Sequence, residues 1–171
     1  MTRLEHTKQR SERNSGAGGV LGAATVATGL AAGVFYVFAC AIMPALARSD
    51  DRVYVDVMRD INDVIQNPVF MLSFLGALPL TGMAAWQARG TPYRAWAWAA
   101  FTAYALAFLV TVAFNIPLND DLANTSDVGT AREEFEDPWV AWNVVRAVLS
   151  TLALGCLARA LVLYGRLRPG A

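Results

Sequence analysis

The sequence predicts an all-α integral membrane protein: a transmembrane four-helix bundle with both termini cytoplasmic and a short amphipathic helix in the first outer loop. Three observations support this. Hydrophobic residues make up 56% of the chain and charged residues 16%, against roughly 25% charged in soluble domains. The apolar residues are gathered into four long blocks, and the polar segments between them alternate in the sign of their charge.

Each apolar block is long enough to cross a bilayer, whose hydrocarbon core of about 30 Å requires about 20 helical residues. The blocks cover approximately residues 20–47, 69–87, 95–114 and 139–164. We therefore expect a disordered cytoplasmic tail over residues 1–19, a four-helix transmembrane domain over 20–165 and a cytoplasmic tail over 166–171. Ala45-Leu46-Ala47 has the form of a signal-peptide cleavage site, but the preceding apolar run exceeds the roughly 7–15 residues of a signal core.

The charges of the polar segments predict the orientation of the chain. Basic residues exceed acidic ones in residues 1–19, 88–94 and 165–171, whereas acids predominate in residues 48–67 and 115–138. Because basic segments stay on the cytoplasmic side, the two acidic loops are expected to face outward. The predicted localisation is the cell membrane, with several spans and both ends inside.

The first outer loop is predicted to form a helix on the membrane surface or over the bundle. Ser49 or Asp50 can cap its start, and Asn67 is expected to end it because Pro68 disfavours helix at the preceding residue. Asn62 is expected to point down into the bundle. Four apolar residues recur at helical spacing on one face: Val53, Val57, Ile61 and Val64.

The second outer loop runs from Asn115 to Pro138. Its Asn-Ile-Pro start at residues 115–117 is expected to break the third helix, and residues 130–136 are expected to form a short helix. Its many carboxylates are interpreted as a solvated surface.

Arg146 is the charge that lies deepest in an apolar block. Arg159 lies thirteen positions further on, nearly on the opposite helix face, and is expected to snorkel to the cytoplasmic surface. An arginine inside a span faces a polar interior or reaches the interface. Three residues share the face of Arg146 at helical spacing: Trp139, Trp142 and Asn143.

Asparagines from other segments are expected at the same depth. Asn115 closes the third span, and Asn62 and Asn67 come from the first outer loop. Together with Arg146 and its aromatic neighbours they predict a polar, aromatic-lined pocket that opens outward. The alternative is that these side chains only tie loops to helices by hydrogen bonds, because buried polar groups need partners.

Other site classes have little support. The single histidine, His6, lies in the polar N-terminal segment, and Cys40 and Cys156 show no metal-binding spacing, so no metal site is expected. The formal net charge is zero, which gives no basic field for nucleic acid. Membrane lipid and a hydrophobic small molecule are the expected partners, while the oligomeric state is left open.

At these residues the chain resembles the anthrone-oxygenase-like family of integral membrane proteins, whose bacterial members are mostly of unknown function. The resemblance implies four spans. From the activity of some members, it also implies oxidation of an anthrone-like aromatic by dioxygen without a cofactor. The segments that carry it follow one another in the family's order: GLAAGVFYVF…MPAL (29–46), MRDINDVIQNPVF (58–70), FLGA (74–77), FNIPLNDDLA (114–123) and WVAWNVVR (139–146).

On this hypothesis Arg146 stabilises an oxyanion, with Asn143 and Asn115 as hydrogen-bond donors and Asp120 as the nearest base. Trp139 and Trp142 would stack on the rings of the substrate. Further candidate contacts to the substrate are Asn62, Asn67 and Asn119. The alternative is a non-enzymatic membrane protein that binds a lipid or small molecule, or acts as a partner subunit. Transport ranks last, because no inverted repeat is visible.

Overall fold

The computed structural model describes the backbone of residues 3–167 and the side chains of residues 16–167. Within these residues every regular element is helical. The predicted four apolar helices are confirmed, because four helical stretches are long and apolar enough to cross a membrane: Gly16–Leu46, Pro68–Gln87, Arg94–Asn124 and Val128–Arg166. The elements in chain order are α1 (Arg3–Val37), a π-helical turn η1 (Phe38–Ile42), α2 (Met43–Leu46), α3 (Asp51–Ile65), α4 (Pro68–Gln87), α5 (Arg94–Val110), a second π-helical turn η2 (Thr111–Asn115), α6 (Ile116–Asn124) and α7 (Val128–Arg166).

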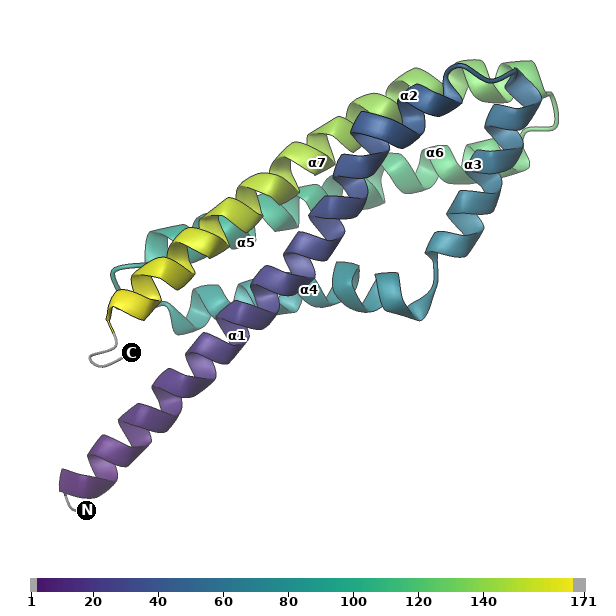
Figure 1. Ribbon diagram of the computed structural model, residues 1–171. Helices are drawn as coiled ribbons and strands as arrows, with labels where there is room; N and C mark the ends of the chain where they lie inside the picture. Colours follow the sequence, from purple (N-terminus) through teal and green to yellow (C-terminus); the bar gives the residue numbers. More distant parts are fainter. Residues whose placement is uncertain (1–2, 168–171) are drawn as a thin grey trace.

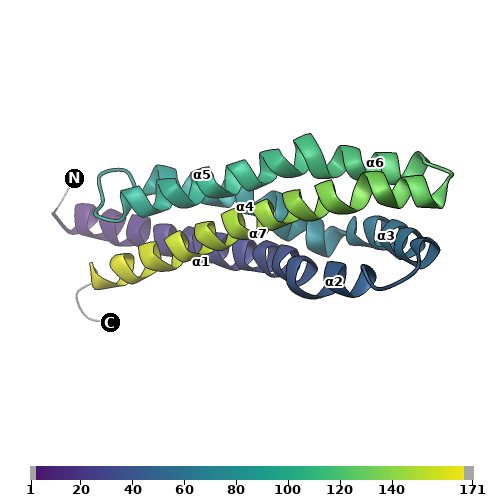
Figure 2. The same ribbon diagram turned by 90° about the horizontal axis from the view of Figure 1, so that it is seen from above.

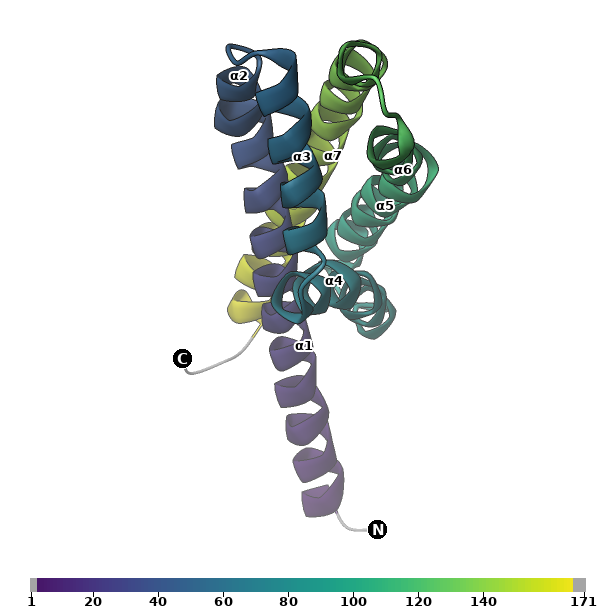
Figure 3. The same ribbon diagram turned by 90° about the vertical axis from the view of Figure 1, so that its right-hand side faces the viewer.

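The four long helices form one elongated body. α1 packs against α4 and α7, and α5 packs against the same two helices. The start of α1, the α4–α5 turn and the end of α7 lie at one end, called here the terminal end (Figure 1). The other end, called the loop end, holds α2, α3, α6 and the first turns of α7 (Figures 1 and 2). Seen along the body, α3 lies beside α1 and α2, whereas α6 continues the line of α5 (Figure 3).

Small residues let the helices approach closely at the terminal end. A Cβ atom added to Gly18 would come within 2.6 Å of the Tyr164 hydroxyl, and the rest of this core is alanine-rich. Close packing through small residues is the usual way that membrane helices associate. The buried alanines of this cluster come from all four long helices: Ala24, Ala84, Ala85, Ala88, Ala97, Ala100 and Ala160.

The third helix does not break where the sequence predicts. Instead, α5 continues through η2 into α6, so the helical stretch runs to Asn124. Pro117 lies in the first turn of α6, where its missing N–H is tolerated because of the π-helical turn just before it. Residues 130–136, predicted to form a short helix, are helical but do not form an element of their own. That segment is the start of α7, which continues past Pro138 without interruption.

The first loop contains a helix, and most of the apolar face predicted for it does not pack against the bundle. α3 begins after Asp50, whose carboxylate accepts a hydrogen bond of 3.0 Å from the Val53 amide. Asn67 follows α3 but caps the start of α4. The residues of α3 that pack inward are Tyr54, Val55 and Met58. Of the predicted apolar face, Ile61 lines a cavity, and three residues are exposed: Val53, Val57 and Val64. Tyr54 and Phe135, from α3 and α7, contact each other at 6.4 Å, so aromatic packing set the rotation of α3.

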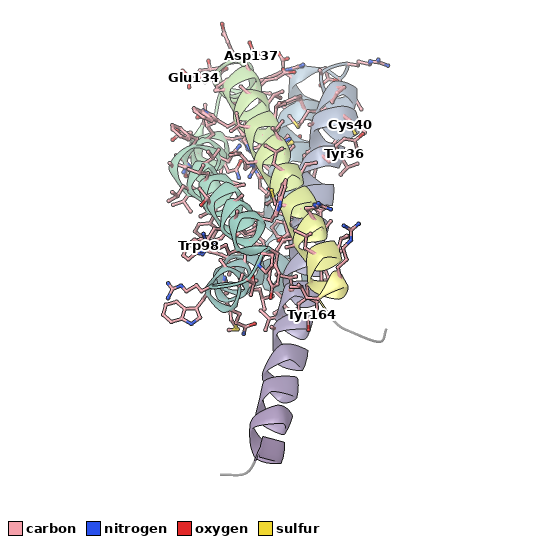
Figure 4. The ribbon with its side chains drawn as sticks, turned by 90° about the vertical axis from the view of Figure 1, so that its left-hand side faces the viewer. Tyr36, Cys40, Trp98, Glu134, Asp137 and Tyr164 are labelled. Atoms are coloured by element: carbon pink, nitrogen blue, oxygen red, sulfur yellow. The ribbon has the colours of Figure 1, made fainter. Side chains whose placement is uncertain are left out.

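The chain ends differ from the expected boundaries. α1 begins at Arg3, ahead of the predicted start of the first span at residue 20. The side chains of residues 1–15 lie outside the described residues, and the tail assigned to residues 1–19 stays a prediction. α7 ends at Arg166, and residues 168–171 of the predicted C-terminal tail also lie outside the description. Figure 4 shows Glu134 and Asp137 at one end of α7 and Tyr164 at the other.

Candidate functional site

A cavity of about 220 Å³ opens in the loop-end half of the body. Its walls come from α1, η1, α3, α4, η2, α6 and α7, so almost every helix contributes to it. Most of the lining is apolar and aromatic, with a few polar side chains. This is the usual character of a small-molecule site. Five of the nine residues predicted from the sequence line the cavity: Arg146, Trp139, Asn62, Asn119 and Asp120.

Arg146 is buried at the cavity, with 6% of its surface exposed. One terminal nitrogen of its guanidinium donates a 2.9 Å hydrogen bond to Oδ1 of Asn143. The guanidinium carbon lies 4.4 Å from the ring of Phe35 and 5.3 Å from that of Trp139. Among the described side chains none forms an ion pair with Arg146, and its Nε has no hydrogen-bond partner.

Asn143 orients the side chain of Arg146 through a hydrogen bond. It is fully buried, and its Nδ2 donates a 3.1 Å hydrogen bond to the backbone carbonyl of Phe35 in α1. The amide therefore connects α1 to α7 while its oxygen accepts from Arg146. The two bonds fix the orientation of the amide, because only the nitrogen can donate and only the oxygen can accept.

Trp139 forms another wall of the cavity. Its Nε1 donates a 2.8 Å hydrogen bond to Oδ1 of Asn119 in α6, and its ring packs 5.6 Å from Phe38. Asn115 lies behind it, fully buried, and donates from Nδ2 to the Trp139 carbonyl at 3.5 Å. The Asn115 oxygen has no partner among the described residues, which leaves an acceptor close to the site.

The two π-helical turns shape the cavity. η1 begins at Phe38 and η2 at Thr111, and both of these residues line the cavity. The Thr111 hydroxyl donates 2.9 Å back to the Ala107 carbonyl, which leaves its methyl group for packing. Single π-helical turns re-aim the side chains that follow them and occur often at functional sites.

α3 covers the cavity and is fastened along its length. The Arg59 guanidinium donates to the Leu122 carbonyl at 3.0 and 2.8 Å and to the Thr125 carbonyl at 2.6 Å, at the end of α6. These bonds satisfy carbonyls that the helix end leaves free. The last turns of α3 supply Ile61, Asn62 and Ile65 to the cavity, and Gln66 follows directly after them; this part of the chain is therefore held against α6.

A second arginine fixes the start of α3. Arg132 forms ion pairs with Asp51 at 3.0 Å and Glu136 at 2.7 Å, and it also donates to the Ser49 carbonyl at 2.9 Å. Its guanidinium carbon lies 4.6 Å from the ring of Tyr54. Burial raises the pKa of Tyr54, and the nearby Glu136 carboxylate acts in the same direction. Tyr54 therefore stays neutral at physiological pH.

Two predicted site residues lie elsewhere. Trp142 stacks on Phe114 with ring centroids 3.8 Å apart and does not line the cavity. It lies about 60° round the helix from Trp139, at 100° per residue, so it faces the flank. Asn67 instead caps α4 by accepting from the Val69 and Phe70 amides at 3.0 and 3.1 Å.

The aromatic lining was missed by reasoning from the sequence. Phe70 stacks on Phe74 at 5.6 Å, and Phe74 contacts Phe108 at 5.4 Å and Phe35 at 6.1 Å. The available signal was the spacing of phenylalanines near the loop end of the first two spans, at i,i+3 across the junction of α1 and η1 and at i,i+4 in α4. By contrast, Tyr36 and Cys40 are exposed and lie on the outer side of this part of the chain (Figure 4).

Metal-binding side chains do not gather in this region. Within the described residues no group of three or more histidine, cysteine, aspartate or glutamate side chains could hold a metal ion. The polar groups at the cavity are a guanidinium, amides, a hydroxyl and one exposed carboxylate, from Asp120. This set can bind an anion, donate hydrogen bonds and accept a proton.

Comparison with known families decides the relationship of the chain. A family model described as anthrone oxygenase matches residues 68–156, just over half of the 171 residues. The chain belongs to the anthrone oxygenase family. The family match runs from the start of α4 into α7, and so includes Asn115, Asn119, Asp120, Trp139, Asn143 and Arg146. No curated protein and no solved structure matches the chain.

Proposed function

We propose that this protein oxidises an anthrone-like aromatic ketone with dioxygen, without a cofactor, in the cavity around Arg146. The observation that carries the proposal is a buried guanidinium that stands among aromatic rings and has no carboxylate partner within the described residues. An uncompensated buried charge is costly. A substrate that becomes anionic during the reaction would supply the missing partner, so the charge stabilises the transition state more than the neutral substrate.

The chemistry needs a base and an oxyanion site. A base removes one proton from the methylene carbon opposite the carbonyl, and the electron pair moves onto the carbonyl oxygen as an aromatic enolate. The enolate carbon gives its electron pair to dioxygen, one electron at a time, and forms a carbon–oxygen bond. Protonation gives a hydroperoxide. Loss of the second carbon-bound proton then breaks the oxygen–oxygen bond. One oxygen atom stays as the new carbonyl, the other leaves as water, and the methylene carbon has lost both hydrogens.

Each role has a candidate residue at the cavity. Arg146 holds the enolate oxygen, and Asn143 keeps its guanidinium oriented. Asp120 is the carboxylate in the cavity lining and is the candidate base. The ring of Trp139 provides a flat wall, and its hydrogen bond to Asn119 fixes that wall in place.

The remaining polar residues act at a distance or at the rim. Asn62 lines the cavity from α3 and can contact substituents on the ring system. Asn115 supports the Trp139 backbone. Neither Trp142 nor Asn67 has a role in this proposal, because both lie outside the cavity lining.

We place the protein in the cell membrane with the terminal end in the cytoplasm and the loop end outside. In support, the terminal end carries basic residues such as Arg89, Arg94 and Arg166, whereas acidic residues such as Asp60, Asp121 and Glu134 crowd the loop end. The cavity would then open near the outer surface, and α3 would lie there with Val53, Val57 and Val64 towards the bilayer.

Turnover with an anthrone tests the proposal. Purified protein in lipid nanodiscs is mixed with the anthrone in air, and quinone absorbance and oxygen uptake are followed above the uncatalysed rate. Arg146→Gln is expected to lower kcat about 10²–10³-fold, the usual effect of removing an oxyanion donor. Arg159→Gln is the matched control because Arg159 is exposed in the same helix, and it should stay within twofold.

The base has its own matched pair. Asp120→Asn is expected to lower kcat by at least about 10²-fold, whereas Asp121→Asn, at the adjacent position outside the cavity, should not. No rate above the uncatalysed reaction in the wild-type protein, or an unchanged rate in folded Arg146→Gln, would reject the proposal. Saturable binding without turnover would favour the alternative, a non-enzymatic binder of a small molecule or lipid.

A further inference from the structure

The cavity combines a permanent positive charge with an apolar interior. Arginine keeps its charge at any physiological pH, and Arg146 is 94% buried, since only 6% of it is exposed. Its Nε lacks a hydrogen-bond partner within the described residues, and its one hydrogen bond goes to a neutral amide. A guanidinium in this state still has donors to offer, and it attracts an anion more strongly than it would in water.

The volume and the aromatic lining of the cavity suit small aromatic ligands. Its volume of about 220 Å³ exceeds the roughly 150 Å³ that suffices for one benzene ring in an apolar cavity. Phe35 and Trp139 flank the guanidinium, and Phe38 and Phe74 complete the aromatic walls. A ligand of one or two fused rings fits inside, and a larger ring system would project through the mouth.

We propose that the cavity is a receptor for planar aromatic monoanions, such as one- and two-ring carboxylates, with the anionic group on Arg146. The inference rests on the proposed function in placing the oxygen of a substrate at the same guanidinium. It goes further in that stable anions bind there without any reaction. Such acids would then be inhibitors that compete with the substrate.

The hydrogen-bonding pattern supports a carboxylate. A guanidinium presents its N–H groups in a planar fork that matches the two oxygens of a carboxylate. In Arg146 one terminal nitrogen donates to Asn143, whereas Nε and the other terminal nitrogen have no hydrogen-bond partner within the described residues. Asp120 is the acid of the cavity lining, but it is exposed. Because water screens an exposed charge, its repulsion of a bound anion is weak.

Calorimetry of naphthoate and its neutral isostere naphthamide tests this proposal. Both ligands are titrated into purified wild-type protein in detergent, with Arg159→Gln in the same detergent as the control for partitioning. We expect naphthoate to bind at least tenfold more tightly than naphthamide to both proteins. In Arg146→Gln the affinity for naphthoate should fall about thirtyfold or more, as expected for loss of one partner of a buried charge pair. The affinity for naphthamide should change little.

Two further variants separate this inference from the proposed oxidation. Asp120→Asn should bind naphthoate as tightly as wild type, or up to about threefold more tightly, although it has lost the base for turnover. Arg146→Lys keeps a charge and should retain part of the preference for the acid, which provides a test if Arg146→Gln does not fold.

Equal affinities for naphthoate and naphthamide in the wild-type protein would overturn the proposal. An equal loss of naphthoate binding in Arg159→Gln and Arg146→Gln would also overturn it. Selective binding of the acid without any anthrone turnover would support the anion site while rejecting the oxidation. Anthrone turnover without selectivity for the acid would support the oxidation while rejecting the anion site.

Discussion

Replacing Asn143 with alanine is expected to destabilise the protein by about 2–4 kcal/mol. The Asn143 amide makes two buried hydrogen bonds, one from the Arg146 guanidinium and one to the Phe35 carbonyl. A hydrogen bond to a charged group contributes about 1.5–3 kcal/mol, and a neutral one about 0.5–1.5 kcal/mol. Loss of both gives the expected range.

Adding Arg146→Met should relieve much of this loss. Asn143→Ala leaves a buried charge without its hydrogen-bond partner, and an unpaired charge accounts for most of the penalty when a buried pair is broken. Once the charge is also removed, an apolar side chain of similar length remains in an aromatic pocket. The double variant is therefore expected to be at least about 1.5 kcal/mol more stable than Asn143→Ala alone.

The assay is denaturant unfolding of the detergent-solubilised protein. The free energy of unfolding is compared among the wild type, Asn143→Ala and the double variant. Asn62→Ala is the control, because the Asn62 side chain lines the same cavity but makes no hydrogen bond within the described residues. Its loss should stay below about 0.5 kcal/mol. The reasoning is refuted if Asn143→Ala costs less than about 1 kcal/mol, or if Arg146→Met deepens the loss.

Three other perturbations have defined outcomes. Arg59→Ala should free α3 from the end of α6 and raise the rate of backbone hydrogen exchange in residues 59–66. Arg52→Ala, at an exposed position of the same helix, should not. Equal exchange rates in the two variants would contradict the role of Arg59 in holding α3 against α6. Phe74→Ala should lower the free energy of unfolding by about 3–5 kcal/mol. It should also let a carboxylate with one ring more than naphthoate bind more tightly than it binds to the wild-type protein. An unchanged preference for ligand size would show that Phe74 does not limit the size of the ligand. In a chain without its native cysteines, Ser126→Cys should react with an impermeant maleimide on intact cells and Gln87→Cys only after permeabilisation; the opposite labelling would reverse the proposed orientation.

The long helices were predictable from the sequence because a membrane span depends on the summed hydrophobicity of many residues. A run of about 20 apolar residues is stable in a bilayer core only as a helix that satisfies its own backbone. The breaks were harder, because a single proline has opposite effects in different backbone contexts. The expected break at Pro117 is absent since a π-helical turn precedes it, and Pro138 is carried within α7.

Part of the candidate site was also predictable from the sequence. A lone guanidinium in an apolar block identified Arg146, and helical spacing placed Asn143 and Trp139 beside it. Spacing did not settle Trp142, which lies near the edge of that face and stacks on Phe114 instead. The phenylalanine walls were not foreseen, because in a span every face is apolar and hydrophobicity does not reveal which residues line a cavity.

The ionisation of a bound naphthol tests the central claim most directly, since it measures oxyanion stabilisation without any turnover. The absorbance of naphthol bound to the protein is titrated against pH and compared with free naphthol and with the Arg146→Gln variant. The account predicts that Arg146 lowers the pKa of the bound naphthol by about 1–3, as a close opposite charge does, and that the variant loses this effect. A bound naphthol whose pKa equals or exceeds its value in water would contradict the claim that the cavity stabilises an aromatic oxyanion.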